Sequence, residues 1–151
     1  MKILCYIVLS FFLLSNANGF DLQNYRIHYS RSSSDKALCE KMMEDLEREK
    51  QSSAIYLGYL GGYQTIWAKH VFNPVTKLNT FKRGSKKIEQ AIKQEPNNVE
   101  LRFIRLSVQV NAPTFLGYHS HIEKDKEFII KNRKQIQSEI VNKNIDLLLK
   151  E

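Results

Sequence analysis

Cysteine is scarce in this chain, which has only Cys5 and Cys39 among its 151 residues. Cys5 lies in an N-terminal segment that we expect to be removed on export, so Cys39 would have no partner for an internal disulfide. Small eukaryotic secreted domains often depend on disulfides, and an exported domain with one thiol is more typical of the bacterial periplasm or cell surface. Because Cys39 lies between the apolar residues Leu38 and Met42, the sequence favours a small buried residue over a reactive thiol.

Long hydrophobic runs are absent after the N-terminal residues 3–14. That run is shorter than the roughly 20 residues that a membrane-spanning helix needs. Lys2 precedes the run, and Ala17 and Gly19 follow it with the spacing of an A-x-A-like cleavage site. We therefore expect residues 1–19 to be a cleavable signal peptide, cut between Gly19 and Phe20. The mature protein is predicted to be periplasmic or secreted, with no transmembrane span.

Catalytic signatures are also missing. The chain has no G-x-S-x-G, no H-E-x-x-H, no phosphate-binding loop and no dinucleotide-binding glycine pattern, so we expect neither an enzyme nor a cofactor. The nearest approach to a metal site is the pair His119 and His121, whereas a zinc site uses about three or four protein ligands. A metal-assisted hydrolase that uses these two histidines is kept as an alternative.

The chain has only a modest excess of positive charge. It contains 23 basic and 16 acidic residues, which gives a net charge of +7. Bases and acids alternate along most of the chain, with short basic clusters at 82–87 and 131–134. Nucleic-acid binding would need a more concentrated basic patch, so we do not expect a nucleic-acid partner. A second alternative is an electrostatic binder of an anionic envelope surface.

Apolar residues recur at spacings of three and four, which predicts an all-α protein of about five helices in antiparallel hairpins or an irregular bundle. Residues 20–34 have no clear period and are expected to be an irregular lead-in to a single helical domain over 35–151. The segment 99–110 fits a helix better than a strand because Asn97 and Glu100 form a capping-box pattern before it. Ser120 and Glu123 form a second such pattern. The expected helices cover 35–50, 53–72, 74–94, 99–110 and, as one helix or a pair, 122–149.

One short segment has the pattern of a known repeat. Gly84, Ile88, Ala91 and Pro96 follow one another at the spacing of the second helix of a tetratricopeptide repeat, and the next helix starts by Glu100. Residues 84–100 therefore resemble a tetratricopeptide junction, which implies antiparallel helical hairpins and carries over no binding residue. The chain as a whole resembles small exported bacterial proteins, which implies no particular activity.

An aromatic stripe in the segment 53–72 is the candidate binding surface. Tyr56, Tyr59, Tyr63 and Trp67 fall on one side of the predicted helix at spacings of three and four. Such a stripe is either part of the core or the lining of a groove for a peptide or sugar. We expect a non-enzymatic module that binds a protein or peptide of the cell envelope, with these four residues as the candidate contact. Nothing in the pattern indicates an oligomeric state.

Overall fold

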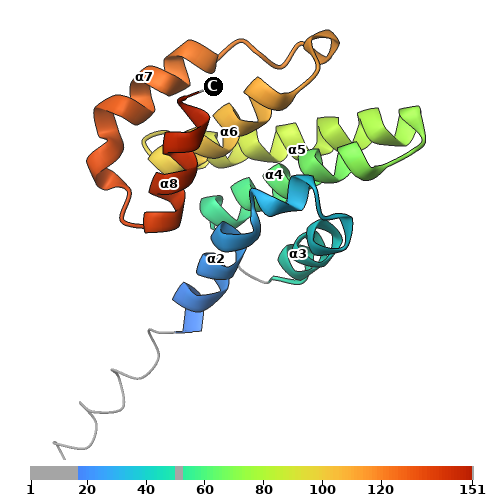
Figure 1. The fold of residues 1–151 in the computed structure, drawn as a ribbon, viewed down its shortest axis with the longest axis horizontal. Helices are drawn as coiled ribbons and strands as arrows, with labels where there is room; N and C mark the ends of the chain where they lie inside the picture. The colour runs from blue at the N-terminus through green and yellow to red at the C-terminus, as the bar shows by residue number, and fades with distance from the viewer. Residues whose placement is uncertain (1–16, 50–52, 151) are drawn as a thin grey trace, which may run out of the picture.

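The computed structural model describes residues 17–49 and 53–150, and it is all-helical over these residues, without a strand. Seven α-helices are present in this part of the chain, where the sequence predicts about five, and Figure 1 shows their arrangement. Short 3-10 turns precede α3 and α7 and separate α7 from α8. The helices are α2 (Ala17–His28), α3 (Lys36–Arg48), α4 (Ala54–His70), α5 (Pro74–Gln94), α6 (Val99–Asn111), α7 (Ile122–Asn132) and α8 (Glu139–Leu148).

The expectation of an irregular lead-in over residues 20–34 is wrong. Helix α2 runs to His28, and the 3-10 turn Arg31–Ser33 follows it. Tyr25 of α2 and Tyr29, which directly follows the helix, project into the core, where they meet tyrosine rings of α4 edge-on, with centroids 5.4 to 6.0 Å apart. This helix is held by tertiary contacts, which explains why its local sequence shows no amphipathic period.

Most of the predicted signal peptide, residues 1–16, lies outside the described residues. The predicted cleavage site after Gly19 falls in the first turn of α2. Cleavage there would leave Tyr25 and Tyr29 in place. Export, and with it a periplasmic or secreted location, stays a prediction. None of the described helices combines the length and the hydrophobicity that crossing a membrane requires.

The central helices match their predicted ranges because strong local signals mark their ends. Helix α5 begins at Pro74, after the side chain of Asn73 accepts hydrogen bonds from the amides of Val75 and Thr76. It continues through Gly84 to Gln94 without a break. The ambiguous segment 99–110 is helical, as α6.

Both predicted capping boxes are wrong in detail. The N-cap of α6 is Asn98, whose side chain accepts from the amide of Leu101 at 3.2 Å, and Asn97 has no such role. The N-cap of α7 is His121, without a side-chain cap, and the Ser120 hydroxyl lies 2.9 Å from the His121 ring. Each N-cap therefore lies one residue after the capping residue that the pattern predicts.

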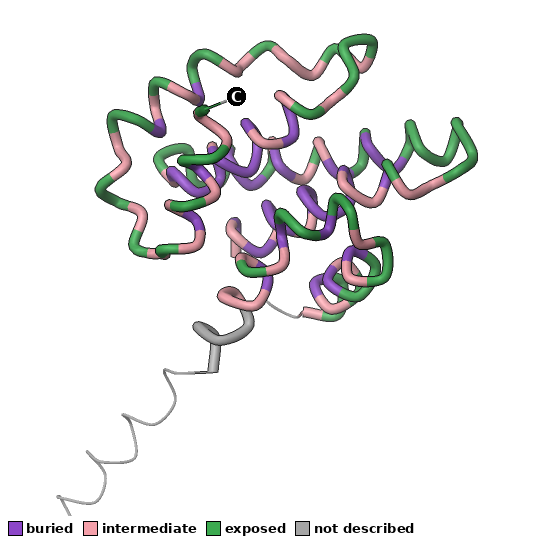
Figure 2. The backbone as a smooth tube through the Cα atoms, in the orientation of Figure 1, coloured by how far each residue is buried: buried purple, intermediate pink, exposed green. Residues whose placement is uncertain are grey.

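Helix α4 forms the centre of the molecule. It packs against α3, α5 and α6, and Figure 2 shows the buried positions concentrated on these middle helices. At the crossing of α4 with α5, a Cβ added to Gly61 would lie 2.6 Å from the carbonyl oxygen of Gly84. The two helix backbones therefore approach each other as closely as glycine allows.

The C-terminal segment 122–149 is a pair of helices. Helix α7 ends at Asn132 and α8 starts at Glu139, so the apolar residues of this segment are divided between two helices. Ile129 on α7 is fully buried, whereas Leu147 on α8 is 55% exposed. Val75 and Leu78 on α5 are also exposed, by 68% and 37%.

Candidate functional site

The three tyrosines of the stripe on α4 belong to the core, which is one of the two roles that the sequence leaves open for them. Tyr56, Tyr59 and Tyr63 have exposed fractions of 7%, 0% and 0%. The Tyr59 hydroxyl donates to Glu100 at 2.7 Å, and the Tyr63 hydroxyl donates to the carbonyl of Tyr25 at 2.6 Å. These three side chains cannot reach a partner in this conformation.

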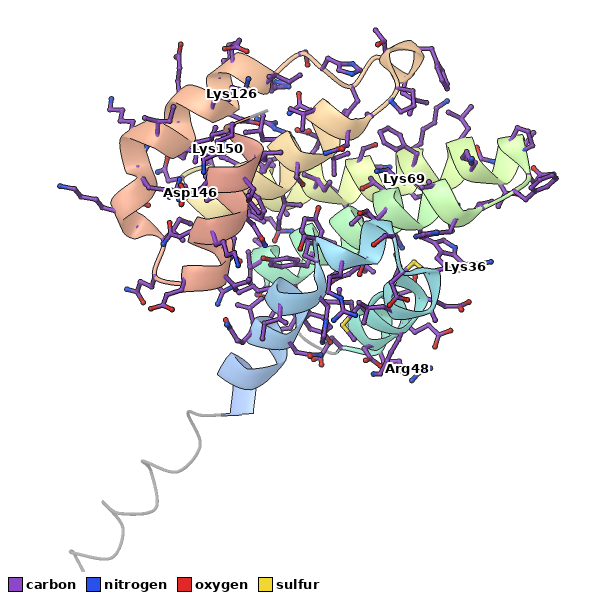
Figure 3. The ribbon with its side chains drawn as sticks, in the orientation of Figure 1. Lys36, Arg48, Lys69, Lys126, Asp146 and Lys150 are labelled. Atoms are coloured by element: carbon purple, nitrogen blue, oxygen red, sulfur yellow. The ribbon has the colours of Figure 1, made fainter. Side chains whose placement is uncertain are left out.

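Trp67, the fourth residue of the stripe, is only half-buried. The ammonium of Lys36 on α3 lies 5.5 Å from the centre of its indole ring, a cation–π contact that covers one face. Figure 3 shows Lys36 at the edge of α3. Trp67 thus lies under a neighbouring side chain and does not extend a groove.

A charged cluster joins α2, α4 and α6 at one end of this core. The guanidinium of Arg26 binds both carboxylate oxygens of Glu100, at 2.7 and 2.6 Å, and Tyr59 donates to the same carboxylate. The hydrogen bond to Glu100 raises the pKa of Arg26 above its ordinary value, although burial opposes this. Burial, followed by the negative charge of Glu100, raises the pKa of Tyr59. All three groups satisfy one another, so the cluster orients α2 and is a structural tie.

The two histidines of the hydrolase hypothesis are engaged elsewhere. The Nε2 atom of His119 lies 3.0 Å from the carbonyl oxygen of Ala112, and the Nδ1 atom of His121 lies 2.9 Å from the Ser120 hydroxyl. Among residues 17–49 and 53–150, no three histidine, cysteine, aspartate or glutamate side chains gather where an ion could bind. No third ligand lies beside His119 and His121 in the described part of the chain, so the structure gives no support to the metal-assisted hydrolase.

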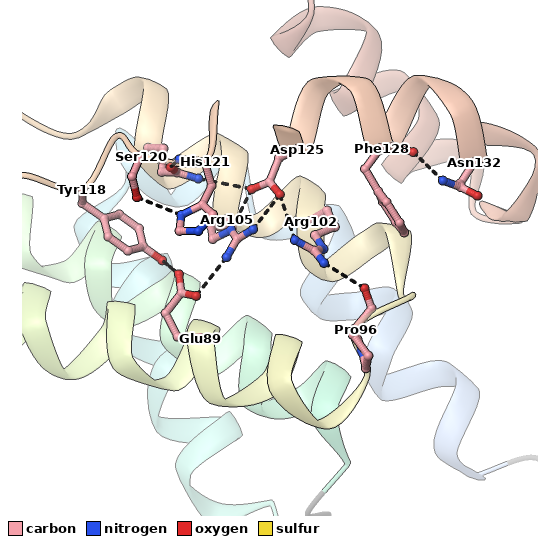
Figure 4. Close-up of polar contacts among 11 residues, drawn as sticks. Glu89, Pro96, Arg102, Arg105, Tyr118, Ser120, His121, Asp125, Phe128 and Asn132 are labelled. Carbon is pink, nitrogen blue, oxygen red and sulfur yellow. Dashed lines mark hydrogen bonds and ion pairs between the residues drawn. The ribbon is translucent and has the colours of Figure 1, made fainter. Parts of the chain in front are cut away.

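Beside these histidines lies a buried ion-pair cluster around Asp125 of α7, drawn in Figure 4. Asp125 has no exposed surface and accepts two hydrogen bonds of 2.7 Å from Arg105. Arg102 and Gln109 of α6 each donate to it at 3.2 Å. Burial alone would lower the pKa of Arg105, but Asp125 raises it above the ordinary value, so the guanidinium stays charged.

The cluster continues to α5. Glu89 accepts from Arg105 at 2.9 Å and from the Tyr118 hydroxyl at 2.7 Å. Burial and then the hydrogen bond to Glu89 raise the pKa of Tyr118 far above its ordinary value. Every contact joins one helix or loop to another, so we interpret the cluster as the clamp that holds α7 on α6. Sequence analysis missed it because nothing local relates Asp125 to Arg105.

Cys39 is fully buried, as its sequence neighbours predict, with its sulfur 3.6 Å from the carbonyl of Tyr63. Burial, with a smaller contribution from Glu40, raises the pKa of the Cys39 thiol to about 12. Since the thiolate is the reactive form, little of it exists below that pH in the folded protein. In a chain carrying Cys5→Ser, we expect Ellman's reagent at pH 8 to label Cys39 at least about 100-fold more slowly than after unfolding in guanidinium. Equal rates in the two states would contradict this burial.

A large pocket lies away from both clusters. It is a half-open pocket of about 740 Å³ between α4, α5, α6 and α8, closed at one side by the loop 112–116. Its volume is within the range of about 300–1,000 Å³ that is typical of sites for small ligands. The inner wall is made by buried apolar side chains, among them Phe81, Phe103 and Val108. Leu78, Phe115 and Leu147 form an exposed apolar mouth.

Four of the five hydroxyl groups that line this pocket already have partners in the protein. The Tyr29 hydroxyl lies 3.1 Å from the hydroxyl of Ser107, which is 2.7 Å from the Ile104 carbonyl oxygen. The hydroxyls of Ser33 and Thr65 donate to backbone carbonyls at 3.1 and 2.7 Å. The pocket therefore offers apolar surface rather than a nucleophile with its base.

The charged side chains that line the pocket are both cations. Lys69 comes from the last turn of α4 and Lys77 from the first turn of α5, and both are exposed at the rim. Figure 3 shows Lys69 on α4. No aspartate or glutamate of the described chain lines the pocket, and neither lysine is in an ion pair there.

Sequence analysis did not identify this pocket. Phe115 and Leu116 are large apolar residues in a loop next to Pro113, which is a signal that the loop covers something. Their partners on α4, α5 and α8 are distant in sequence, and only the folded chain brings them together. No protein-family model, curated protein or solved structure matches this chain, so the candidate site is assigned on its geometry alone.

Proposed function

We propose that this protein is an exported, non-enzymatic binding module that holds an apolar ligand in the pocket between α4, α5, α6 and α8. The observation that carries the proposal is a 740 Å³ half-open cavity with a buried apolar wall and an exposed apolar mouth. Burying apolar surface is favourable by roughly 25 cal/mol per Å². An exposed site of this kind is therefore better explained by a ligand than by folding.

The predicted protein or peptide partner would have to use the same pocket. The tyrosines expected to contact it are buried, and the pocket mouth offers the apolar residues Phe115 and Leu147 in their place. A peptide would enter with an apolar side chain, whereas a small ligand would enter whole. The enclosed volume favours the small ligand.

The proposal is tested by titrating the protein with N-phenyl-1-naphthylamine, an uncharged probe that fluoresces in apolar surroundings. We expect saturable binding that Leu147→Asp weakens by about tenfold, because a carboxylate at the mouth must be desolvated when the probe enters. Leu147 is 55% exposed, so the substitution should leave the fold intact.

Ile130→Asp is the matched control, because Ile130 is 63% exposed on α7 and does not line the pocket. It introduces the same charge at a similar exposure and should leave probe binding unchanged. Equal binding by all three proteins, or none by the unmodified chain, would refute the proposal.

The electrostatic alternative keeps one supporting observation. Lys82, Arg83, Lys86 and Lys93 are exposed on α5, and none of them is in an ion pair within the described residues. Such a surface could approach an anionic envelope polymer. The double substitution Lys82→Met with Lys86→Met removes two of these charges and should weaken such binding.

The finer description of the fold, antiparallel hairpins with a tetratricopeptide-like junction, also belongs to the proposal. It is supported by the packing of α4 on α5, where Gly58 lies against Ala91 and Gly61 against Gly84, in opposite chain directions. Gly84 and Ala91 are two of the residues that carry the resemblance. A peptide-binding repeat array is not needed for the proposed pocket.

A further inference from the structure

The charges at the pocket rim are unbalanced. Lys69 and Lys77 leave adjacent turns of α4 and α5, which are joined by residues 71–73, and both line the pocket mouth. Lys69 and Lys77 have no carboxylate partner in the described part of the chain, and the same is true of other exposed lysines such as Lys82 and Lys86. What distinguishes Lys69 and Lys77 is their place at the mouth of an apolar pocket that no described aspartate or glutamate lines.

We infer that the ligand is an amphipathic anion, with its apolar body in the pocket and a carboxylate-type head group at Lys69 and Lys77. This inference rests on the proposed function and adds the chemical class of the ligand. An apolar wall excludes a hydrated head group from the interior, and the two ammonium groups supply its charge-assisted hydrogen bonds at the rim. An uncharged ligand would gain no affinity from the two ammonium groups, and a cationic one would be repelled.

A general attraction of anions to a basic protein would look similar and must be separated from a specific site. The chain has a net charge of +7, which by itself raises the local concentration of any anion. The two explanations differ in which lysines affect binding. The affinity of a head group bound at the rim depends on Lys69 and Lys77, whereas a general attraction depends equally on lysines elsewhere.

The experiment uses three ligands with the same chain length: dodecanoate, dodecan-1-ol and dodecyltrimethylammonium. The two ions are kept below their micelle concentrations and the alcohol below its solubility limit. Each competes with N-phenyl-1-naphthylamine for the purified full chain at low salt. We expect dodecanoate to bind at least about tenfold more tightly than dodecyltrimethylammonium, with the alcohol between them, because two partly screened cations act on the head group.

In the double variant Lys69→Met with Lys77→Met, the preference for dodecanoate over dodecyltrimethylammonium is expected to fall to within about twofold. Lys82→Met with Lys86→Met removes the same net charge from exposed positions outside the pocket and should retain the preference.

Each other outcome overturns a specific statement. Equal affinities for the three ligands would refute the anionic head group and leave the apolar pocket in place. Equal loss of the preference in both double variants would assign it to net charge. If no ligand displaces the probe because the probe itself does not bind, the proposed function fails and the inference fails with it.

Discussion

Replacing Asp125 by alanine is expected to lower the free energy of unfolding by about 3–5 kcal/mol, the largest effect of any single substitution discussed for this protein. Asp125 is fully buried and is the acceptor for Arg105, Arg102 and Gln109. Its removal leaves the guanidinium of Arg105 with only Glu89 as a carboxylate partner, in a side chain that is 3% exposed. The cost is the desolvation of an incompletely paired charge, and urea unfolding followed by circular dichroism measures it.

Two controls separate this explanation from a general sensitivity of α7. The double substitution Arg105→Met with Asp125→Leu removes both charges and should be far less harmful than Asp125→Ala. Glu44→Ala removes an exposed pair with Arg48 on α3 and should change stability by less than about 1 kcal/mol. If Asp125→Ala prevents folding, Asp125→Asn, which keeps an oxygen for Arg105, should give a folded and measurably weakened protein. An Asp125→Ala protein as stable as the unmodified chain would contradict the clamp.

Gly61→Ala is expected to destabilise the protein by about 2 kcal/mol, against the direction set by helix propensity. In an open helix this substitution would stabilise by up to about 1 kcal/mol. Here the new Cβ would lie 2.6 Å from the carbonyl oxygen of Gly84 and 3.0 Å from the backbone nitrogen of Ile88. Backbone atoms of a helix cannot turn aside, so α5 must move away from α4 and lose packing over its length.

Gly58→Ala is the matched control on the same helix. Its new Cβ would meet the end of the Leu101 side chain first, and the next atoms lie at 3.6 and 3.7 Å. A leucine methyl can shift, so the loss should be clearly smaller than for Gly61→Ala. Thermal unfolding of the two variants compares them directly, and an equal or greater loss at Gly58 would show that the helix crossing does not depend on Gly61.

Local signals account for the parts of the fold that could be predicted. The start of α5 follows from Asn73 and Pro74, because a side-chain cap and a fixed φ act within a few residues. The apolar spacing of Leu38, Met42 and Leu46 likewise predicts α3. Helix α2 was missed because it is stabilised by contacts with another part of the chain. The rings of Tyr25 and Tyr29 pack against tyrosines of α4, which lie outside the segment.

The candidate site could not be predicted from local sequence signals. The aromatic spacing on α4 is correct, but spacing shows only that Tyr56, Tyr59 and Tyr63 share a face, and α2 covers that face. Leu78 and Leu147 have the spacing of core residues, yet they lie at the mouth of the pocket because no helix packs over them there. Burial depends on the neighbour opposite a residue, which its own segment does not specify.

The sequence by itself determined that this protein is helical, where its central helices begin and end, and that Cys39 is buried, since each depends on neighbouring residues and their periodicity. The tertiary structure alone decided that the tyrosines are core, that Asp125 clamps α7 to α6, and that Lys69 and Lys77 share the rim of an apolar pocket. These features join residues from separate helices, and such contacts form only when packing brings the helices together.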